Sequence, residues 1–175
     1  MYVWSEARRV AEGVGYIAFN MFMDPENVMR TAGDAIQSCM ECRGLIIDLR
    51  GNPGGIAAMA LGLAGWFVRD EGRHLGAMFT REAKLNFVVN PRPVVYQGRL
   101  AILVDGCTLS AAEIFAGGMK DIGRARIFGS RTAGGALPSV FEKLPTGDGF
   151  QYAFANYLSA GGKPLEARAS ARMCK

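Results

Sequence analysis

The stretch GLIIDLRGNPGG, residues 44–55, decides the fold that this sequence predicts. Its first half, residues 45–49, is a short and almost continuous apolar run, which is typical of a β-strand covered on both faces. Its second half breaks that strand and ends in two glycines, Gly54 and Gly55. The apolar residues 56–68 that follow predict a buried helix. The stretch therefore predicts a strand, a tight turn and the start of a helix in direct succession.

The same alternation of strands and helices continues along most of the chain. Asp24 has the residue type of a helix N-cap, and Pro25 that of a first helical position. Apolar residues follow at helical spacing up to Met40, and Gly44 ends the predicted helix. Other segments predict strands at 15–22, 100–104 and 125–128, a helix at 110–121, one or two strands within 78–95, and a hairpin at 141–158 around residues 146–149. Buried strands that alternate with helices predict an α/β fold with a largely parallel sheet. Ligands of such sheets bind beyond the carboxyl ends of the strands.

Length and composition exclude several classes of protein. The 175 residues suit a single domain, and 50% hydrophobic with 21% charged residues excludes a disordered tail, a coiled coil and a collagen-like fibre. Twenty basic and sixteen acidic residues leave a net charge of +4, which no run of Lys or Arg concentrates. We therefore expect neither nucleic acid nor a membrane as a partner. The longest apolar run, residues 56–68, is too short to span a bilayer.

The four cysteines indicate neither a disulfide scaffold nor a metal site. Cys39 and Cys42 have the CxxC spacing of redox and zinc sites, but no second CxxC accompanies them, and His74 is the only histidine. A tetrahedral zinc shell would therefore lack ligands. We expect no metal and no cofactor. We expect all the cysteines, Cys107 and Cys174 included, to be thiols that are buried or uninvolved in function.

The turn at Gly54 and Gly55 is one of two loops that can carry chemistry. Unpaired N–H groups at a helix N-terminus attract negative charge, and glycines let another group approach the backbone closely. The turn can therefore serve as an oxyanion hole, although an ordinary tight turn between a strand and a helix has the same composition. Asp48 and Arg50 lie two residues apart on one face of the strand, and we expect them to brace the loop as an ion pair.

The second loop places Ser110 between the strand 100–104 and the helix 110–121. A serine at a turn from strand to helix has the position of the nucleophile in an α/β-hydrolase elbow. The tetrapeptide SAAE, residues 110–113, also fits a capping box, in which the serine only caps the helix. The local sequence leaves both roles open, because a serine that caps its helix can also react.

Together these segments resemble the C-terminal processing peptidases, also called tail-specific proteases. Three stretches carry the resemblance, in order, over roughly residues 14–166. They are GYIAFNMF with GLIIDLRGNPGG, then LAILVDGCTLSAAEIFAGGMKDIGRARIFGSRTAGGA, then LPTGDGFQYAFANYLSAGGKPLE. The resemblance implies a ClpP/crotonase-like α/β core and a serine nucleophile, which would be Ser110. The oxyanion hole would then consist of the backbone amide of Ala111 and one amide from Gly54 or Gly55.

The position of the general base departs from the best-known branch of that family, in which a lysine lies in a T-x-G-K-G motif. The matching segment here is TAGGA, residues 132–136, so Gly135 occupies the lysine position, and Ser139 occupies that of a glutamine four residues further on. This form more closely resembles the branch that includes the tricorn core protease and the retinoid-binding modules of photoreceptors. In the tricorn core a histidine near the first strand is the base, and the matching residues 16–19 include no histidine.

The sequence therefore does not identify the general base. A serine hydroxyl without a nearby base is a poor nucleophile, so one is needed for efficient catalysis. Lys143, Lys84 and His74 are the remaining candidates. Lys143 is favoured because it lies on the strand just after the glycine-rich loop.

We expect a serine peptidase that cleaves peptide bonds of protein substrates, with Ser110 and Lys143 as catalytic residues. Two alternatives stay open. One is a catalytically impaired relative that binds peptide or an apolar small molecule in the same cleft, and the other is an esterase, which needs the same oxyanion hole but makes less demand on a base. Residues 1–175 are expected to form a single peptidase core without the substrate-recognition (PDZ) domain of most relatives. The apolar content allows a homo-oligomer. The first residues are not typical of a secretory signal, so the compartment stays open.

Overall fold

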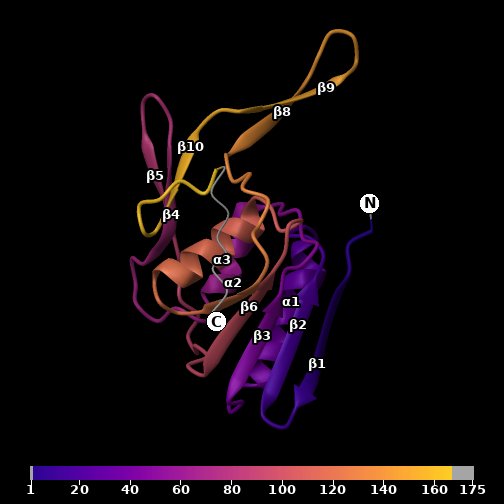
Figure 1. The fold of residues 1–175 in the computed structure, drawn as a ribbon, viewed down its shortest axis with the longest axis vertical. Coiled ribbons are helices and arrows are strands. Elements are labelled where there is room, and N and C mark those ends of the chain that lie inside the picture. The colour runs from indigo at the N-terminus through magenta and orange to yellow at the C-terminus, as the bar shows by residue number, and fades with distance from the viewer. Residues whose placement is uncertain (1, 167–175) are drawn as a thin grey trace.

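The computed structural model describes residues 2–166, and its central element is a five-stranded sheet (Figure 1). The strand order is β1-β2-β3-β6-β7, with β1 antiparallel to β2 and all other neighbours parallel. The bounds are β1 Ser5–Ala11, β2 Val14–Phe19, β3 Gly44–Asp48, β6 Arg99–Val104 and β7 Arg126–Gly129. The predicted α/β fold with a largely parallel sheet is confirmed. Strand β1 was not predicted from the sequence.

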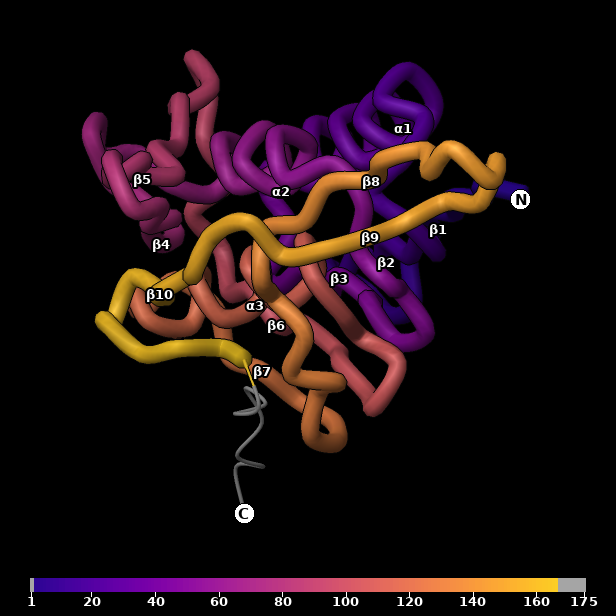
Figure 2. The backbone as a smooth tube through the Cα atoms, turned by 90° about the horizontal axis from the view of Figure 1, so that it is seen from above, coloured from indigo at the N-terminus to yellow at the C-terminus, as the bar shows by residue number. Residues whose placement is uncertain are grey.

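Three helices lie on the same side of this sheet, as Figure 2 shows. They are α1 Pro25–Ser38, α2 Ala57–Ala64 and α3 Ala111–Asp121. Helix α1 begins as predicted, because the Asp24 side chain accepts a hydrogen bond from the N–H of Asn27 and Pro25 lies in the first turn. The helix ends at Ser38, before the predicted end, and α2 is shorter than the apolar run 56–68.

The core lies between the sheet and the helices, and a row of isoleucines marks it. Ile17, Ile47, Ile102 and Ile127 stand side by side in register across four parallel strands. All four are buried, and β-branched side chains of this kind favour the strand conformation. This register brings the carboxyl ends of β3 and β6 to the same edge of the sheet.

A second, antiparallel sheet lies on the far side of α3. Its strand order is β10-β4-β5, with bounds β4 His74–Phe79, β5 Lys84–Val88 and β10 Asn156–Ser159. Helix α3 packs against β4 and β10. Gly118 of α3 permits the close approach, because a Cβ at this position would lie 2.5 Å from the Cβ of Leu75. The strands expected within 78–95 are present, but the first of them begins earlier, at His74.

Strands β8 (Ser139–Lys143) and β9 (Gly149–Ala153) form a hairpin that projects from the rest of the molecule (Figure 1). The hairpin predicted around residues 146–149 is confirmed. Directly opposite residues of a hairpin share one face, so the register sorts the side chains into two sets. One face carries the pairs Ser139 with Ala153, Phe141 with Gln151 and Lys143 with Gly149.

An ion pair holds the carboxyl end of β3. The Nη2 atom of Arg50 lies 2.6 Å from Oδ2 of Asp48, and the Tyr16 hydroxyl of β2 donates to the same oxygen at 2.8 Å. Asp48 is buried, whereas Arg50 is half-exposed. Burial alone would raise the pKa of Asp48, but the hydrogen bonds from Arg50 and Tyr16 outweigh it and lower this pKa below its ordinary value. The carboxylate is therefore held in its ionised form.

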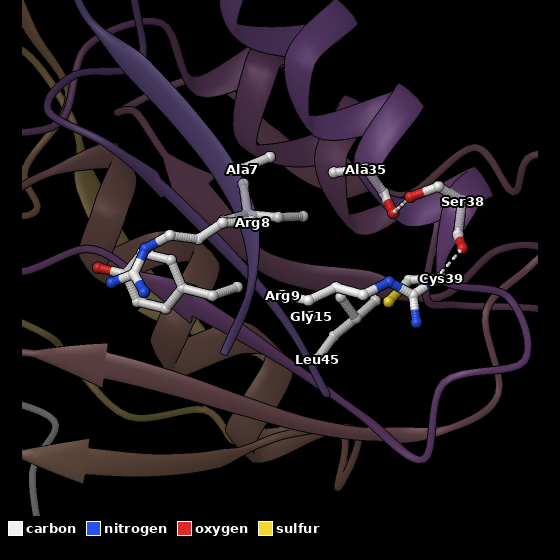
Figure 3. A pocket seen from close by; sticks show the side chains of 10 residues that line it. Ala7, Arg8, Arg9, Gly15, Ala35, Ser38, Cys39 and Leu45 are labelled. Atoms are coloured by element: carbon white, nitrogen blue, oxygen red, sulfur yellow. Dashed lines mark hydrogen bonds between the residues drawn. The ribbon is translucent and has the colours of Figure 1, made fainter. Parts of the chain in front are cut away.

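Cys39 and Cys42 form a disulfide bond, so the prediction of thiols was wrong for this pair. The chain turns tightly after α1, where the N–H of Cys42 donates to the carbonyl of Cys39 at 2.9 Å, and this turn brings the two sulfurs together. Both residues are buried. Figure 3 shows Cys39 beside a cavity of about 130 Å³ between β1, β2 and α1, where Arg9 binds the carbonyl oxygen of Ser38.

Cys107 is a free, exposed thiol, and Cys174 lies outside the described residues. Within residues 2–166, no group of three or more His, Cys, Asp or Glu side chains could hold a metal ion. None of the helices in this part of the chain has the length and hydropathy needed to cross a membrane.

Replacing Asp48 by Asn should make the free energy of unfolding change less with pH in the acid range. A carboxyl whose pKa is lower in the folded chain stabilises the fold above its unfolded-state pKa of about 4, and this stabilisation is lost as the pH falls through the folded-state pKa. At about pH 7 we expect Asp48→Asn to lower the free energy of unfolding by about 1–3 kcal/mol, the usual range for hydrogen bonds to a charged group. Urea titrations at several pH values measure the effect.

The matched control is Asp34→Asn, at an exposed position of α1. It should leave the free energy of unfolding within about 0.5 kcal/mol of the unmodified protein. A cost of Asp48→Asn that stays the same from neutral to strongly acid pH would contradict a role for the ionised carboxylate.

Candidate functional site

Ser110 lies at a sharp turn between β6 and α3. Strand β6 ends at Val104, and α3 begins at Ala111, directly after the serine. Ser110 has φ 54° and ψ −121°, and it is one of two non-glycine residues with positive φ in the described chain. A non-glycine residue in such a conformation is strained and needs support from its surroundings. The backbone of Ser110 is therefore that of an elbow, and the hydroxyl stands at the start of a helix.

The loop before Ser110 is tied directly to the glycine turn after β3. The N–H of Leu109 donates to the carbonyl of Asn52 at 3.0 Å, and the Thr108 hydroxyl donates to the carbonyl of Leu49 at 2.8 Å. Asn52 is completely buried, and its side-chain amide donates to the carbonyl of Phe19 at 2.9 Å. Two loops that are more than fifty residues apart in the sequence thus lie against each other.

Gly54 is in contact with the serine elbow itself. A Cβ on Gly54 would lie 2.6 Å from the Leu109 carbonyl oxygen, 2.7 Å from the Cβ of Ser110 and 2.8 Å from the Ala111 nitrogen. Its φ of 93° also favours glycine. Any side chain at Gly54 would therefore displace the serine.

Gly55 completes the turn, with a φ of 132°, and a Cβ there would collide with the carbonyl oxygen of Phe22. Phe22 holds the turn in place, because its N–H donates to the Gly54 carbonyl at 2.7 Å. The N–H of Gly54 is already bound to Oδ1 of Asn52 at 2.9 Å. Within residues 2–166, by contrast, the N–H groups of Gly55 and Ala111 have no hydrogen-bond acceptor.

The carboxylate of Glu113 organises the other side of the elbow. Glu113 is completely buried, and its Oε2 accepts from the N–H of Ser110 at 3.1 Å, which is one half of the expected capping box. The same carboxylate accepts from the Thr132 hydroxyl at 2.7 Å, from the N–H of Gly134 at 2.8 Å and from the N–H of Gly135 at 2.9 Å. The sequence motif indicated the cap but not these three contacts to the glycine-rich loop.

Ser110 opens into a cavity of about 540 Å³ between the two loops and the hairpin. One face of the hairpin lines this cavity. Four residues of that face, those nearest the body of the molecule, are part of the cavity wall: Ser139, Phe141, Gln151 and Ala153. The remaining lining residues come from the two loops, the glycine-rich segment and the last described residue: Pro53, Gly55, Leu109, Ser110, Gly135, Leu137 and Glu166. The wall combines apolar side chains with polar ones, namely Ser139, Gln151 and Glu166 beside Ser110, and this mixture suits an extended peptide.

None of the three candidate bases lines this cavity. Lys143 lies on the cavity-facing side of the hairpin, but one residue pair further out, opposite Gly149, and it is exposed. Lys84 and His74 lie on β5 and β4 of the second sheet. Among the described residues, the buried Nδ1 atom of His74 has no hydrogen-bond partner. Lys143 therefore stays a prediction. Asp48 and Arg50 form the expected ion pair at the end of β3, outside the cavity wall.

The chain was compared with known proteins. The model of peptidase family S41 matches residues 13–169. A carboxyl-terminal-processing protease of Synechocystis sp. is 31% identical over 152 residues, which cover 85% of this chain and 34% of the relative. A carboxy-terminal-processing protease of Bartonella bacilliformis is 26% identical over 168 residues, which cover 90% of this chain and 37% of the relative.

Solved structures agree on the fold. The photosystem II D1 C-terminal processing protease has a TM-score of 0.78 and 24% identity, and the match covers 97% of this chain and 46% of that structure. At this identity the likeness concerns the fold alone. The chain spans about a third of the length of the curated relatives, which are matched over 34% and 37% of their residues. Because the family model matches most of the sequence, the chain belongs to peptidase family S41.

Proposed function

We propose that this chain is the catalytic core of a serine peptidase that cleaves peptide bonds of protein substrates, with Ser110 as nucleophile. The observation that carries the proposal is the contact between the serine elbow and the Gly54–Gly55 turn, at the mouth of a cavity. The names of the relatives support a substrate segment near an exposed carboxyl-terminal end. An extended segment of that kind suits the cavity under the hairpin.

The proposed reaction uses main-chain groups to stabilise charge. The Oγ of Ser110 forms a bond to the scissile carbonyl carbon and gives up its proton to a base, and the carbonyl oxygen becomes an oxyanion. The N–H groups of Gly55 and Ala111 would stabilise this oxyanion, because both lack an acceptor among the described residues. Gly54 has a different role, since its own N–H is bound to Asn52. The protonated base then gives its proton to the leaving amine as the C–N bond breaks, and water hydrolyses the acyl-enzyme and regenerates the Ser110 hydroxyl.

We assign the proton transfer to Lys143. Its support is its place on the hairpin face that lines the cavity, two residues beyond Phe141 on the same strand. Residues two apart on a strand are separated by roughly 7 Å, so Lys143 lies one step beyond the cavity wall on the face that lines it. A base must come within hydrogen-bond reach of the serine hydroxyl in the complex with substrate.

One observation favours a second candidate function. Within the described residues, the cavity wall contains no Lys, Arg or His side chain. A site with an oxyanion hole and no base would bind a peptide, or an apolar small molecule, without cleaving it. An esterase is the intermediate case, because the better leaving group of an ester reduces the demand on a base.

Ser110→Ala should abolish labelling by a fluorophosphonate probe, which reacts with activated serines. Ser139→Ala is the matched control, because Ser139 lines the same cavity from the hairpin, and this variant should label at the rate of the unmodified protein. Labelling that persists in Ser110→Ala would contradict the assignment. If the unmodified protein neither labels nor cleaves a peptide that it binds, the binding function holds instead.

Lys143→Ala should slow labelling of Ser110 by a factor of about 10²–10⁴, the usual cost of losing a general base. Lys84→Ala removes the same charge from an exposed position on the second sheet and should have no effect. The labelling rate as a function of pH distinguishes a lost base from a lost fold. Equal rates in both variants would exclude Lys143 as the base.

Glu113→Gln should lower the free energy of unfolding by about 1–3 kcal/mol and slow labelling of Ser110. A glutamine has the same shape but only one acceptor oxygen, so N–H donors of the elbow and of the glycine-rich loop lose their partner. Glu142→Gln, in the exposed hairpin, is the control and should leave both quantities unchanged. Thermal unfolding and the labelling rate are measured on the same variant. Slow labelling of a protein that is still folded shows that the elbow has lost its geometry.

A further inference from the structure

We infer that a second site, distinct from the serine cavity, binds an oxyanion of the phosphate class. It is a cavity of about 380 Å³ at the amino-terminal ends of β6 and β7, at the edge of the sheet opposite Ser110. Three arginines line it, namely Arg99, Arg124 and Arg126, together with Leu100, Gly123 and Ala125. Neither the fold nor the proposed peptidase reaction requires a positive charge at this edge.

Arg124 is the fixed member of this arginine cluster. Its Nε donates to the carbonyl of Phe67 at 2.8 Å, and its Nη2 donates to the carbonyls of Tyr96 at 2.7 Å and Gly98 at 3.0 Å. The rings of Phe67 and Tyr96 flank the guanidinium, with centroids 5.8 Å and 5.9 Å from its central carbon. The guanidinium is thus locked in place by neutral groups, and burial lowers its pKa.

This arrangement leaves a positive charge without an anion. Burying a charge is costly unless an opposite charge compensates it, and carbonyl dipoles compensate only in part. Arg99 and Arg126 add two more charges to the same cavity, on exposed side chains that begin their strands. Within residues 2–166, none of the three forms an ion pair with a carboxylate.

The surrounding surface strengthens the positive field. An adjoining cavity shares Gly123 and Arg124 and is also lined by Arg69, Arg73 and Asp70. Asp70 lies 3.4 Å from Arg73 and neutralises it. The side chains that line the two cavities therefore include five arginines and one aspartate.

The chemistry of the ligand follows from the side chains. Arginine presents planar pairs of N–H donors that match the oxygens of phosphate, and it stays charged at all physiological pH values. Several arginines around an open cavity favour a multiply charged oxyanion over a single carboxylate, because each added charge contributes its own attraction. We therefore assign this site to phosphate or to a phosphate-bearing anion such as pyrophosphate.

The experiment measures the thermal unfolding midpoint of the full chain with increasing pyrophosphate or inorganic phosphate, at an ionic strength held constant with sodium chloride. The unmodified protein should gain stability with a saturating dependence on pyrophosphate, because a ligand that binds only the folded state raises the midpoint. The double variant Arg99→Gln/Arg126→Gln should bind at least tenfold more weakly. Arg124 is left in place because its three carbonyl contacts support the fold.

The matched control is Arg30→Gln/Arg81→Gln, which removes the same charge from exposed positions on α1 and in the turn after β4. It should respond to pyrophosphate like the unmodified protein. No rise in the unmodified protein, an undiminished rise in the double variant, or an equal rise with acetate would each overturn the proposal. If the double variant does not fold, NMR of the unmodified protein decides, since binding must shift the Gly123 and Ala125 amide signals while those near Ser110 stay in place.

Discussion

The buried carboxylate of Glu113 is the interaction on which the functional site depends. It accepts four hydrogen bonds, from the Ser110 N–H, the Thr132 hydroxyl and the N–H groups of Gly134 and Gly135. A buried charge is costly unless its hydrogen-bonding capacity is filled, and here it is filled by the groups that need to be held. The strained backbone of Ser110 costs on the order of 1–3 kcal/mol, which bonds of this kind can offset.

At the glycine turn, on the other side of the site, the neutral side chain of Asn52 holds the backbone as the Glu113 carboxylate does at the elbow. Asn52 is buried, and it binds the Gly54 N–H with its oxygen and the Phe19 carbonyl with its amide. The candidate site is thus built mostly from main-chain atoms, which two buried polar side chains hold in position. Gly54 and Gly55 allow the segments to approach this closely, because a Cβ at either position would collide with the backbone of a neighbouring segment. Such a site tolerates little change in backbone geometry.

The two ends of the parallel sheet have different characters. The carboxyl ends of β3 and β6 lead into the loops of the candidate serine site, where the lining combines apolar and polar side chains. The amino-terminal ends of β6 and β7 carry the arginine cluster. Because strands separate the two ends, a ligand at one need not obstruct the other. The projecting hairpin belongs to the serine end and carries Lys143 on the face that lines the cavity.

Local signals in the sequence were sufficient for many elements of this protein. The N-cap at Asp24, the apolar strands, the turn at Gly54 and Gly55 and the start of a helix at Ser110 depend on residues close together in the chain. Strand β1 was missed because its polar residues face solvent on an edge, where the apolar alternation is weak. The disulfide was missed because CxxC spacing is common to thiols, disulfides and metal sites.

The sequence by itself determined the alternation of strands and helices and the residue types at the two loops. Only the tertiary structure decided that Asn52 and Leu109 are bonded neighbours, that Glu113 reaches across to the glycine-rich loop, and that five scattered arginines share one edge. The physical reason is that propensity, capping and periodicity act over a few residues. Contacts between distant segments depend instead on which strands become neighbours in the sheet, and parallel neighbours are joined only through long crossover connections.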